Sequence, residues 1–385
     1  MKVAIVGGAL QGTEAVYLSK KAGYETFVID RRDNAPALSL ADGHAVFDPE
    51  LDGKRAMRIF EDCDAVLPAC ENITLLRSLT NMMRSSDVPL LFDLDSYIVS
   101  SSKAASNQMM SAAGIPLPKD WPECGFPVIV KPSAQSGSVG VRVAYSEEDV
   151  NAGINEIVMM GDRPVIQEFV SGPCVSMEVV GNGKEYRSYV TTEIILSENY
   201  DCKRVRCSPE VLGHGKEEEF RAITERTAAY IGLNALMDIE AIDTKKGLRI
   251  LEIDARIPSQ TPAAVLAATG VNIVEELVNS RTGKFGGKRM NGASSYEHFL
   301  IKDKKLITCG EKEFAHVVRP KIEKGLFGAD EFISDHRAGA KEWRGTMING
   351  APTEQALEKK RTGCIETIMR ECGLKEFVDG QPEMM

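Results

Sequence analysis

The chain has 385 residues, 43% of them hydrophobic and 26% charged, which is typical of a soluble globular protein of two or three domains and excludes a disordered or fibrous one. Its formal net charge of -10 at pH 7 disfavours nucleic acid and anionic membranes as partners, so we expect small-molecule substrates. No apolar run approaches the roughly 18 to 20 residues of a membrane helix, and the nine cysteines form no CxxC pair, which predicts reduced thiols and a cytoplasmic location.

The first 30 residues predict a βαβ unit, with a strand over Lys2–Gly8, a helix over Gln11–Ala22 and a strand over Glu25–Ile29. A glycine turn that leads into a helix can bind the pyrophosphate of a dinucleotide. Here the turn reads GGALQG, and Thr13 or Glu14 stands where the third glycine is expected. An NAD-dependent oxidoreductase is therefore a disfavoured alternative.

Two further strands, Ala65–Ala69 and Pro89–Asp93, end in polar clusters. The carboxyl ends of parallel strands are where open α/β sheets bind ligands. This position makes Gln11, Glu71 and Asn72 candidates for holding a polar substrate. The alternative is that these side chains only cap helices.

A nucleotide-binding segment begins at Lys103, at the start of a predicted helix. The strand Pro127–Val130 then delivers Lys131, and the small-residue loop Ser133–Gly140 follows. Such a loop can close its backbone amides over phosphate oxygens, and the lysine ammonium can lie against the same phosphates. A surface hairpin with a small-residue turn is the alternative.

The next apolar strand, Val165–Val170, contains a polar pair and leads into Ser171-Gly172-Pro173. Such a hinge can pair its backbone with an adenine edge while apolar neighbours enclose the ring. The residues concerned are Gln167, Glu168, Phe169 and Val170.

The stretch from Leu236 to Arg256 predicts a β-hairpin in which polar residues alternate with period two on both arms. The alternation places Arg256 on the same face as four carboxylates, those of Asp238, Glu240, Glu252 and Asp254.

If the loop is Lys245-Lys246-Gly247, Glu240 faces Glu252 and Asp238 faces Asp254. Like charges directly opposite on a sheet are destabilising, so cations should neutralise them. Oxygen ligation of this kind suits Mg²⁺, which commonly bridges carboxylates and substrate phosphates. An edge hairpin with its acidic face in water is the alternative.

Taken in this order, the elements resemble the ATP-grasp superfamily of carboxylate-amine ligases, whose acidic strand pair has the form E...E-x-N-x-R. Here that motif stands as Glu240 and EIDAR from Glu252 to Arg256. Within the superfamily, the chain is more similar to the 3-methylornithine:lysine ligases of pyrrolysine biosynthesis. The likeness covers roughly the first 280 residues and is carried by GGALQGTEAVYLSKKAG, LFDLDSY, SGSVG, Tyr200-Asp201-Cys202 and EIDARIPSQTP.

The sequence departs from the superfamily at two positions. The hinge reads Gly172-Pro173 where a glutamate usually follows the glycine and reaches the ribose, so that contact is in doubt. The usual asparagine is Asp254, which the more similar ligases share; an extra carboxylate favours holding two cations.

The resemblance implies an α/β protein with an ATP-grasp fold after a Rossmann-like half-domain. The expected divisions are 1–95 for that N-terminal domain, 96–285 for the ATP-grasp subdomains and 286–385 for a C-terminal α/β portion.

The resemblance also implies an activity. ATP would phosphorylate the carboxylate of (3R)-3-methyl-D-ornithine, and the side-chain amine of L-lysine would attack the acyl phosphate to form an amide, with two Mg²⁺ ions bound. A D-alanine:D-alanine ligase or another dipeptide ligase is the alternative among enzymes, and a non-catalytic nucleotide-binding regulator is the alternative outside them.

The implied site residues fall into groups by ligand. The ATP-binding group is Lys103, Lys131, Ser136, Gly137, Ser138, Gln167, Glu168, Phe169 and Val170. The metal ligands are Glu240, Glu252 and Asp254, and Arg256 is catalytic, binding the reacting carboxylate. The ornithine would contact Glu178, Asp201, Asp238, Ser259 and Thr261, and the lysine would contact Gln11, Glu71 and Asn72; each of these substrate residues has a purely structural role as its alternative.

Overall fold

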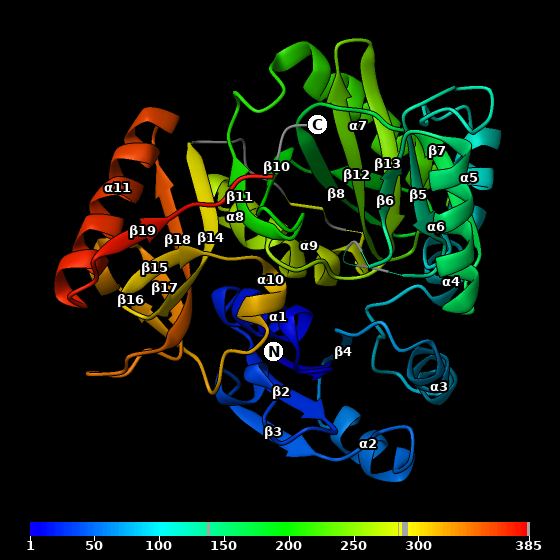
Figure 1. The fold of residues 1–385 in the computed structure, drawn as a ribbon. Coiled ribbons are helices and arrows are strands. Elements are labelled where there is room, and N and C mark those ends of the chain that lie inside the picture. The colour runs from blue at the N-terminus through cyan, green and yellow to red at the C-terminus, as the bar shows by residue number, and fades with distance from the viewer. Residues whose placement is uncertain (136, 138, 284, 287–291, 383–385) are drawn as a thin grey trace.

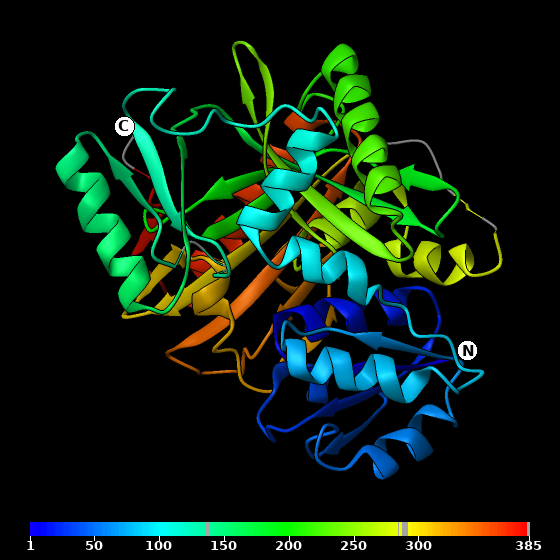
Figure 2. The ribbon, with the colours of Figure 1, turned by 90° about the vertical axis from the view of Figure 1, so that its right-hand side faces the viewer.

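The computed structural model describes residues 1–135, 137, 139–283, 285, 286 and 292–382 (Figure 1). Within those ranges the strands form three sheets, of four, three and twelve strands. Figure 2 shows the N-terminal sheet as a separate layer beneath the largest sheet. The mixed helix and strand content agrees with the predicted α/β class.

The N-terminal sheet is parallel, in the order β3-β2-β1-β4, and confirms the predicted βαβ opening. The predicted strand Pro89–Asp93 is wrong: only Leu90 bridges to the sheet, opposite Val66. The side chain of Asp93 accepts a hydrogen bond from Ser96 N and caps the following helix, so the chain leaves the sheet there. The elements of this region are β1 Lys2–Val6, α1 Leu10–Lys21, β2 Glu25–Asp30, η1 Pro36–Ser39, β3 Gly43–Val46, α2 Gly53–Phe60, β4 Ala65–Pro68, α3 Ile73–Met83, α4 Leu94–Ser100 and α5 Lys103–Ala112.

The three-stranded sheet has the order β6-β5-β7 and is antiparallel. Its apolar residues, among them Val128 and Val130, pack against Ile157 of α6 in a small core of their own. This sheet carries the predicted lysine and hinge segments. Its elements are β5 Val128–Pro132, β6 Arg142–Ala144, α6 Glu147–Met159 and β7 Pro164–Glu168.

The large sheet follows the path β13-β12-β8-β10-β11-β14-β18-β17-β16, with β9, β15 and β19 beside it. β11 pairs with β14, so the hydrogen bonding continues across residue 285, and the predicted division there stays a prediction. Its strands are β8 Cys174–Gly181, β9 Tyr186–Ser188, β10 Thr192–Leu196, β11 Cys202–Cys207, β12 Leu236–Thr244, β13 Gly247–Asp254, β14 Ala293–Lys302, β15 Lys305–Thr308, β16 Lys321–Lys324, β17 Glu331–Ser334, β18 Trp343–Ala351 and β19 Glu376–Val378. Its helices are α7 His214–Ile231, α8 Thr261–Thr269, α9 Ile273–Ser280, α10 Glu311–Phe314, η2 Leu326–Gly328 and α11 Glu354–Glu371.

The register of the β12–β13 hairpin combines a confirmed prediction with a wrong one. Glu240 does pair with Glu252, and Asp238 with Asp254. The loop is shorter than predicted, since Thr244 pairs with Gly247 and leaves two residues between them. The register then shifts by one residue beyond Glu240, so a bulge restores the expected pairing.

Helices α8 and α9 follow the hairpin in the chain, and both contact α1 of the N-terminal region. No single helix in the described ranges is long and apolar enough to cross a membrane. These two pass that test only as a pair, which is bent by 95°. Most of their residues are buried in the protein, which is how core helices behave.

Candidate active site

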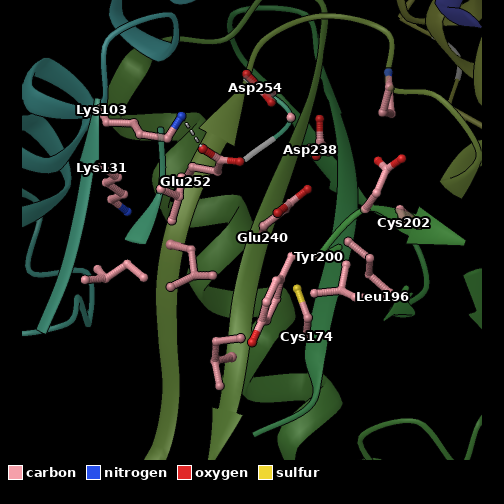
Figure 3. A pocket seen from close by; sticks show the side chains of 18 of the residues that line it. Lys103, Lys131, Cys174, Leu196, Tyr200, Cys202, Asp238, Glu240, Glu252 and Asp254 are labelled. Carbon is pink, nitrogen blue, oxygen red and sulfur yellow. Dashed lines mark ion pairs between the residues drawn. The ribbon is translucent and has the colours of Figure 1, made fainter. Parts of the chain in front are cut away.

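A cavity of about 360 Å³ lies between the three-stranded sheet and the hairpin face of the large sheet (Figure 3). It gathers most of the predicted nucleotide and hairpin residues, whereas Ser136 and Ser138 lie outside the described residues. The predicted residues that line it are Lys103, Lys131, Gly137, Gln167, Glu168, Phe169, Val170, Asp201, Asp238, Glu240, Glu252, Asp254, Arg256, Ser259 and Thr261.

Two lysines enter the cavity from separate elements. Lys131 lies on β5 and is only 7% exposed, and this burial lowers its pKa to about 8. Lys103 starts α5, which Ser102 caps, and its Nζ lies 2.7 Å from Glu252 Oε2. Burial alone would lower the pKa of Lys103, but the attraction of Glu252 raises it above its ordinary value. Figure 3 shows the Lys103 ammonium directed at Glu252.

The carboxylates of the hairpin face titrate differently because their neighbours differ. Burial and the facing Glu252 raise the pKa of Glu240 to about 8. Burial also acts on Glu252, but Lys103 outweighs it and holds the pKa of that carboxyl below its ordinary range. Burial raises the pKa of Asp254 to about 6 against the attraction of Arg256, and burial with Asp254 raises that of Asp238 strongly.

The three predicted metal ligands share one face but do not form a finished metal site. Among the described residues, no group of three acidic, histidine or cysteine side chains is arranged to hold a metal ion. Glu252 forms an ion pair with Lys103, and Asp254 forms one with Arg256 at 3.1 Å, so these two cations of the protein neutralise part of the negative charge. The donor set nevertheless fits Mg²⁺ carried by a nucleotide, since carboxylate oxygens supply part of its shell and phosphates the rest.

Arg256 connects the hairpin to the N-terminal region. Its Nε lies 2.9 Å from Glu71 Oε1, and Gln11 Nε2 donates to the same oxygen at 2.8 Å. Burial would lower the pKa of Arg256, but Asp254 and Glu71 raise it, so the guanidinium stays charged. The structure therefore brings Gln11 and Glu71 to the reaction site predicted around Arg256.

Asn72 has the structural role that was the alternative for it. Its side chain accepts hydrogen bonds from Thr74 N and Leu75 N and caps α3. It also lines, with Glu71, a second cavity of about 250 Å³ at the carboxyl ends of the N-terminal strands.

Glu178 does not line the cavity as the structure describes it, and its predicted contact with substrate stays a prediction. It is fully buried on β8, at the register position opposite Asp238 on β12, and Thr261 at the start of α8 lies close to its carboxylate. Burial raises the pKa of Glu178 to about 7.

Among the lining residues that were not predicted, Gln260 and Glu311 are joined to each other by a hydrogen bond. Glu311 Oε2 accepts hydrogen bonds from Ser259 Oγ at 2.7 Å and from Gln260 Nε2 at 3.1 Å. Gln260 stood inside the PSQTP turn already singled out, so its position was a usable signal. Glu311 follows the hairpin by more than 50 residues in a charged stretch, and no motif there distinguishes it.

Comparisons with known proteins agree with this geometry. A family described as ATP-grasp domain matches residues 100–260. The 3-methyl-D-ornithine--L-lysine ligase of Methanosarcina barkeri is 35% identical over 314 residues, covering 80% of this chain and 83% of the relative. The same-named ligase of Methanosarcina acetivorans is 34% identical over 370 residues, covering 94% and 96%. Among solved structures, the biotin carboxylase–β,γ-ATP complex of Campylobacter jejuni matches 95% of this chain and 91% of its own with a TM-score of 0.74. At 15% sequence identity, this match shows that the two proteins share a fold.

Proposed function

Because this chain belongs to the family of 3-methyl-D-ornithine--L-lysine ligases and carries an ATP-grasp domain, we propose that it joins a 3-methyl-D-ornithine carboxylate to the side-chain amine of L-lysine at the expense of ATP. The observation that carries the proposal is one cavity in which Lys103, Lys131 and Arg256 meet the acidic face of the hairpin. The chemistry of amide formation needs both kinds of charge at that place.

A free carboxylate reacts with an amine too slowly in water because oxide is a poor leaving group. Transfer of the γ-phosphoryl group to the carboxylate gives an acyl phosphate, and attack by the amine then releases phosphate. The protein's contribution is mainly to position polyanions and to neutralise charge that develops during transfer.

The side chains of the cavity have distinct tasks in that sequence. Lys131 and Lys103 bind the phosphates; Lys103 exchanges its present partner, Glu252, for a phosphate oxygen. Arg256 binds the reacting carboxylate and the oxyanion that forms on it. Phe169 and Val170, with Gln167 and Glu168, enclose the adenine at the end of β7.

Glu240, Glu252 and Asp254 would hold Mg²⁺, as two ions in our proposal, and the metal supplies neutralisation of the phosphate charge when bound. The residues themselves supply oxygen donors on one face, with Glu240 free of any ion pair among the described residues.

The substrate contacts follow the placement of the acids. Asp238 lines the cavity, and no described residue bonds to its Oδ1, so this atom can accept a hydrogen bond from an ammonium group of the ornithine. Asp201, Ser259 and Thr261 border the same space. Gln11 and Glu71, already at Arg256, are placed to hold lysine on the opposite side. We keep the divisions 1–95, 96–285 and 286–385 as part of this proposal, and a cytoplasmic location, which ATP use and nine free thiols favour.

The test is a coupled assay of phosphate release from Mg-ATP with D-ornithine or 3-methyl-D-ornithine and with L-lysine, singly and together. We expect turnover only with both amino acids and an amide of their combined mass less water. D-alanine alone serves as the comparison for a D-alanine:D-alanine ligase.

Phosphate release with D-alanine and silence with the diamino acids would overturn the substrates but keep the ATP-grasp activity. Lys131→Met is the control for contaminating ATPases, since it should abolish release with every amino acid pair.

A further inference from the structure

The short helix α10, from the C-terminal portion of the chain, contributes Glu311 to the wall of the active-site cavity. One carboxylate oxygen, Oε2, accepts hydrogen bonds from Ser259 and Gln260. The other, Oε1, has no hydrogen-bond partner among the described residues. A half-buried carboxylate with one oxygen bound and one open can accept a hydrogen bond from a ligand.

The start of α10 is built so that Glu311 holds this position. Asp201 Oδ2 accepts a hydrogen bond from Lys312 N at 3.0 Å and caps the helix from the β10–β11 connection. Gly310 makes the approach possible, because a Cβ at that residue would lie 2.0 Å from Asp201 Oδ2. Two parts of the sequence about 110 residues apart are therefore fitted together to place a single carboxylate.

The partner of Glu311 is itself held in an uncommon conformation. Gln260 has a backbone φ of +77°, which residues other than glycine rarely adopt. Its amide nitrogen donates to Glu311, and its amide oxygen accepts from Cys202 Sγ at 3.2 Å. Backbone strain of this kind persists where surrounding contacts over-determine it and is common in binding sites.

The charges of the cavity indicate which group Glu311 meets. Lys103 and Lys131 lie at the end of the cavity where the phosphates of ATP would bind. Asp238 and Glu311, in contrast, form no ion pair with a cation among the described residues. Asp238 is 4% exposed, and its Oδ1 has no hydrogen-bond partner within the described ranges of the chain. An acidic wall with open oxygens calls for a ligand that carries ammonium groups.

We propose that Glu311 is the specificity-determining residue that binds the terminal, side-chain ammonium of the carboxylate-donating diamino acid. The proposal rests on the proposed function. When Arg256 binds the donor carboxylate, the α-ammonium lies only one carbon from that carboxylate, and Asp238 binds it. The terminal ammonium lies three carbons farther along, toward the turn of Ser259 and Gln260 on which Glu311 is fixed.

The experiment compares two donors in the assay of amide formation with L-lysine and Mg-ATP. D-ornithine carries the terminal ammonium, and D-norvaline has the same chain without it. Glu311→Gln keeps the shape and removes the charge. Glu313→Gln is the matched control, since Glu313 lies on the same helix but pairs with Arg344 outside the cavity.

We expect Glu311→Gln to lower kcat/KM for D-ornithine by roughly 10- to 100-fold, which is the usual worth of a hydrogen bond to a charged group. The loss should be in KM for the donor, with KM for L-lysine and ATP unchanged. For D-norvaline the variant and the wild type should be equal, and Glu313→Gln should resemble the wild type with both donors.

Equal losses of Glu311→Gln with both donors, or a loss confined to KM for L-lysine, would overturn the proposal. Absence of an amide with any donor in the wild type would instead overturn the proposed function. Glu311→Asp is a second variant in case the first folds poorly, because it keeps the charge but places it one methylene farther back. It should lower kcat/KM for D-ornithine and leave kcat/KM for D-norvaline unchanged. The reverse pattern would contradict the assignment.

Discussion

Glu240 and Glu252 lie directly opposite each other on β12 and β13, and of the two only Glu252 forms an ion pair with a lysine in the described part of the chain. This difference separates their titration, with the pKa of Glu252 below its ordinary range and that of Glu240 raised to about 8. At neutral pH the nucleotide-free protein therefore relieves the repulsion by keeping a proton on Glu240. When two carboxylates lie opposite each other on a sheet and one cation pairs with only one of them, the pKa of the other rises and it keeps its proton.

Binding of Mg-nucleotide should release that proton. We expect calorimetric titrations at pH 7.5, in buffers of different ionisation enthalpy, to show more proton release for the wild type than for Glu240→Gln. The comparison isolates Glu240, because Lys131, whose pKa burial lowers to about 8, takes up part of a proton in both proteins. Identical buffer dependence in the two proteins would contradict the assignment of Glu240.

The same residue predicts a pH dependence of stability. The folded protein keeps the proton of Glu240 up to about pH 8, whereas the unfolded chain loses it near the ordinary pKa of 4.5. Through this residue the nucleotide-free protein loses stability as the pH rises from 4.5 to 8. Glu240→Gln should remove that slope and raise the free energy of unfolding at pH 7 by about 1 to 2 kcal/mol. Urea unfolding at pH 5 and pH 7 measures the slope. A slope as steep in the variant as in the wild type would show that other buried acids cause it, such as Glu178 and Asp254, whose pKa values are also raised.

Arg256 gives the third prediction at the scale of single residues. Its proposed ligand is the reacting carboxylate, so Arg256→Ala should lower kcat by roughly 100- to 1,000-fold, as loss of an oxyanion donor does. The Kd for Mg-ATP should change by less than about threefold. Arg249→Ala is the control, since Arg249 lies on the same strand and does not line the cavity. Equal losses in kcat and nucleotide affinity would refute the role.

Among the elements, the connection from β7 to β8 shows how a departure from the superfamily pattern is accommodated. Pro173 replaces the usual glutamate, but its carbonyl accepts a hydrogen bond from Asp243 N at 2.9 Å. Gly172 precedes it with a φ of +153°, and a Cβ there would lie 2.2 Å from Asp243 O. The hinge is thus held to the end of the acidic hairpin by its backbone.

Gly172→Ala should therefore destabilise the protein by about 2 to 4 kcal/mol, because the added methyl group meets a backbone carbonyl in a strained conformation. Gly183→Ala is the control: its φ is also positive, at +82°, but no atom of the described residues lies within 4 Å of the new Cβ. That change should cost about 1 kcal/mol. Urea unfolding of the two variants checks the difference, and equal costs would mean that the hinge moves away freely.

Across the whole molecule, polar contacts join parts that are distant in sequence. Tyr17 OH on α1 donates to Glu331 Oε2 on β17 at 2.7 Å, and Ala263 N on α8 donates to Glu14 Oε1 at 2.8 Å. Figure 1 shows the C-terminal segment passing from α11 back across the large sheet. There Asp379 pairs with Lys203, which is 2% exposed and follows the cavity residue Cys202.

Removal of Asp379 should leave the buried Lys203 ammonium without its carboxylate. We expect Asp379→Ala to lower the free energy of unfolding by about 2 to 4 kcal/mol. Glu376→Ala breaks the nearby exposed pair with Lys305 and should cost less than about 1 kcal/mol. Thermal unfolding of both variants tests this, and a negligible effect of Asp379→Ala would show that Gly380 O and water suffice for the ammonium.

The sequence by itself determined the βαβ opening, the lysine and hinge strands and the shared acidic face of Asp238, Glu240, Glu252 and Asp254. These features could be predicted because the alternation of side chains along a strand and the turn chemistry of glycine are local properties of the backbone. The resemblance to ATP-grasp ligases added the order of the motifs and the role of each.

Only the tertiary structure decided which partner each charge meets and what completes the cavity. The bulge that keeps Glu240 opposite Glu252, the burial of Glu178 and the position of Glu311 at the cavity all depend on how distant segments pack. Packing is governed by the summed burial of apolar surface in several elements, and no local sequence pattern around Glu311 shows that sum. The capping of α3 by Asn72, in contrast, is a local contact that the sequence analysis already offered as its alternative role.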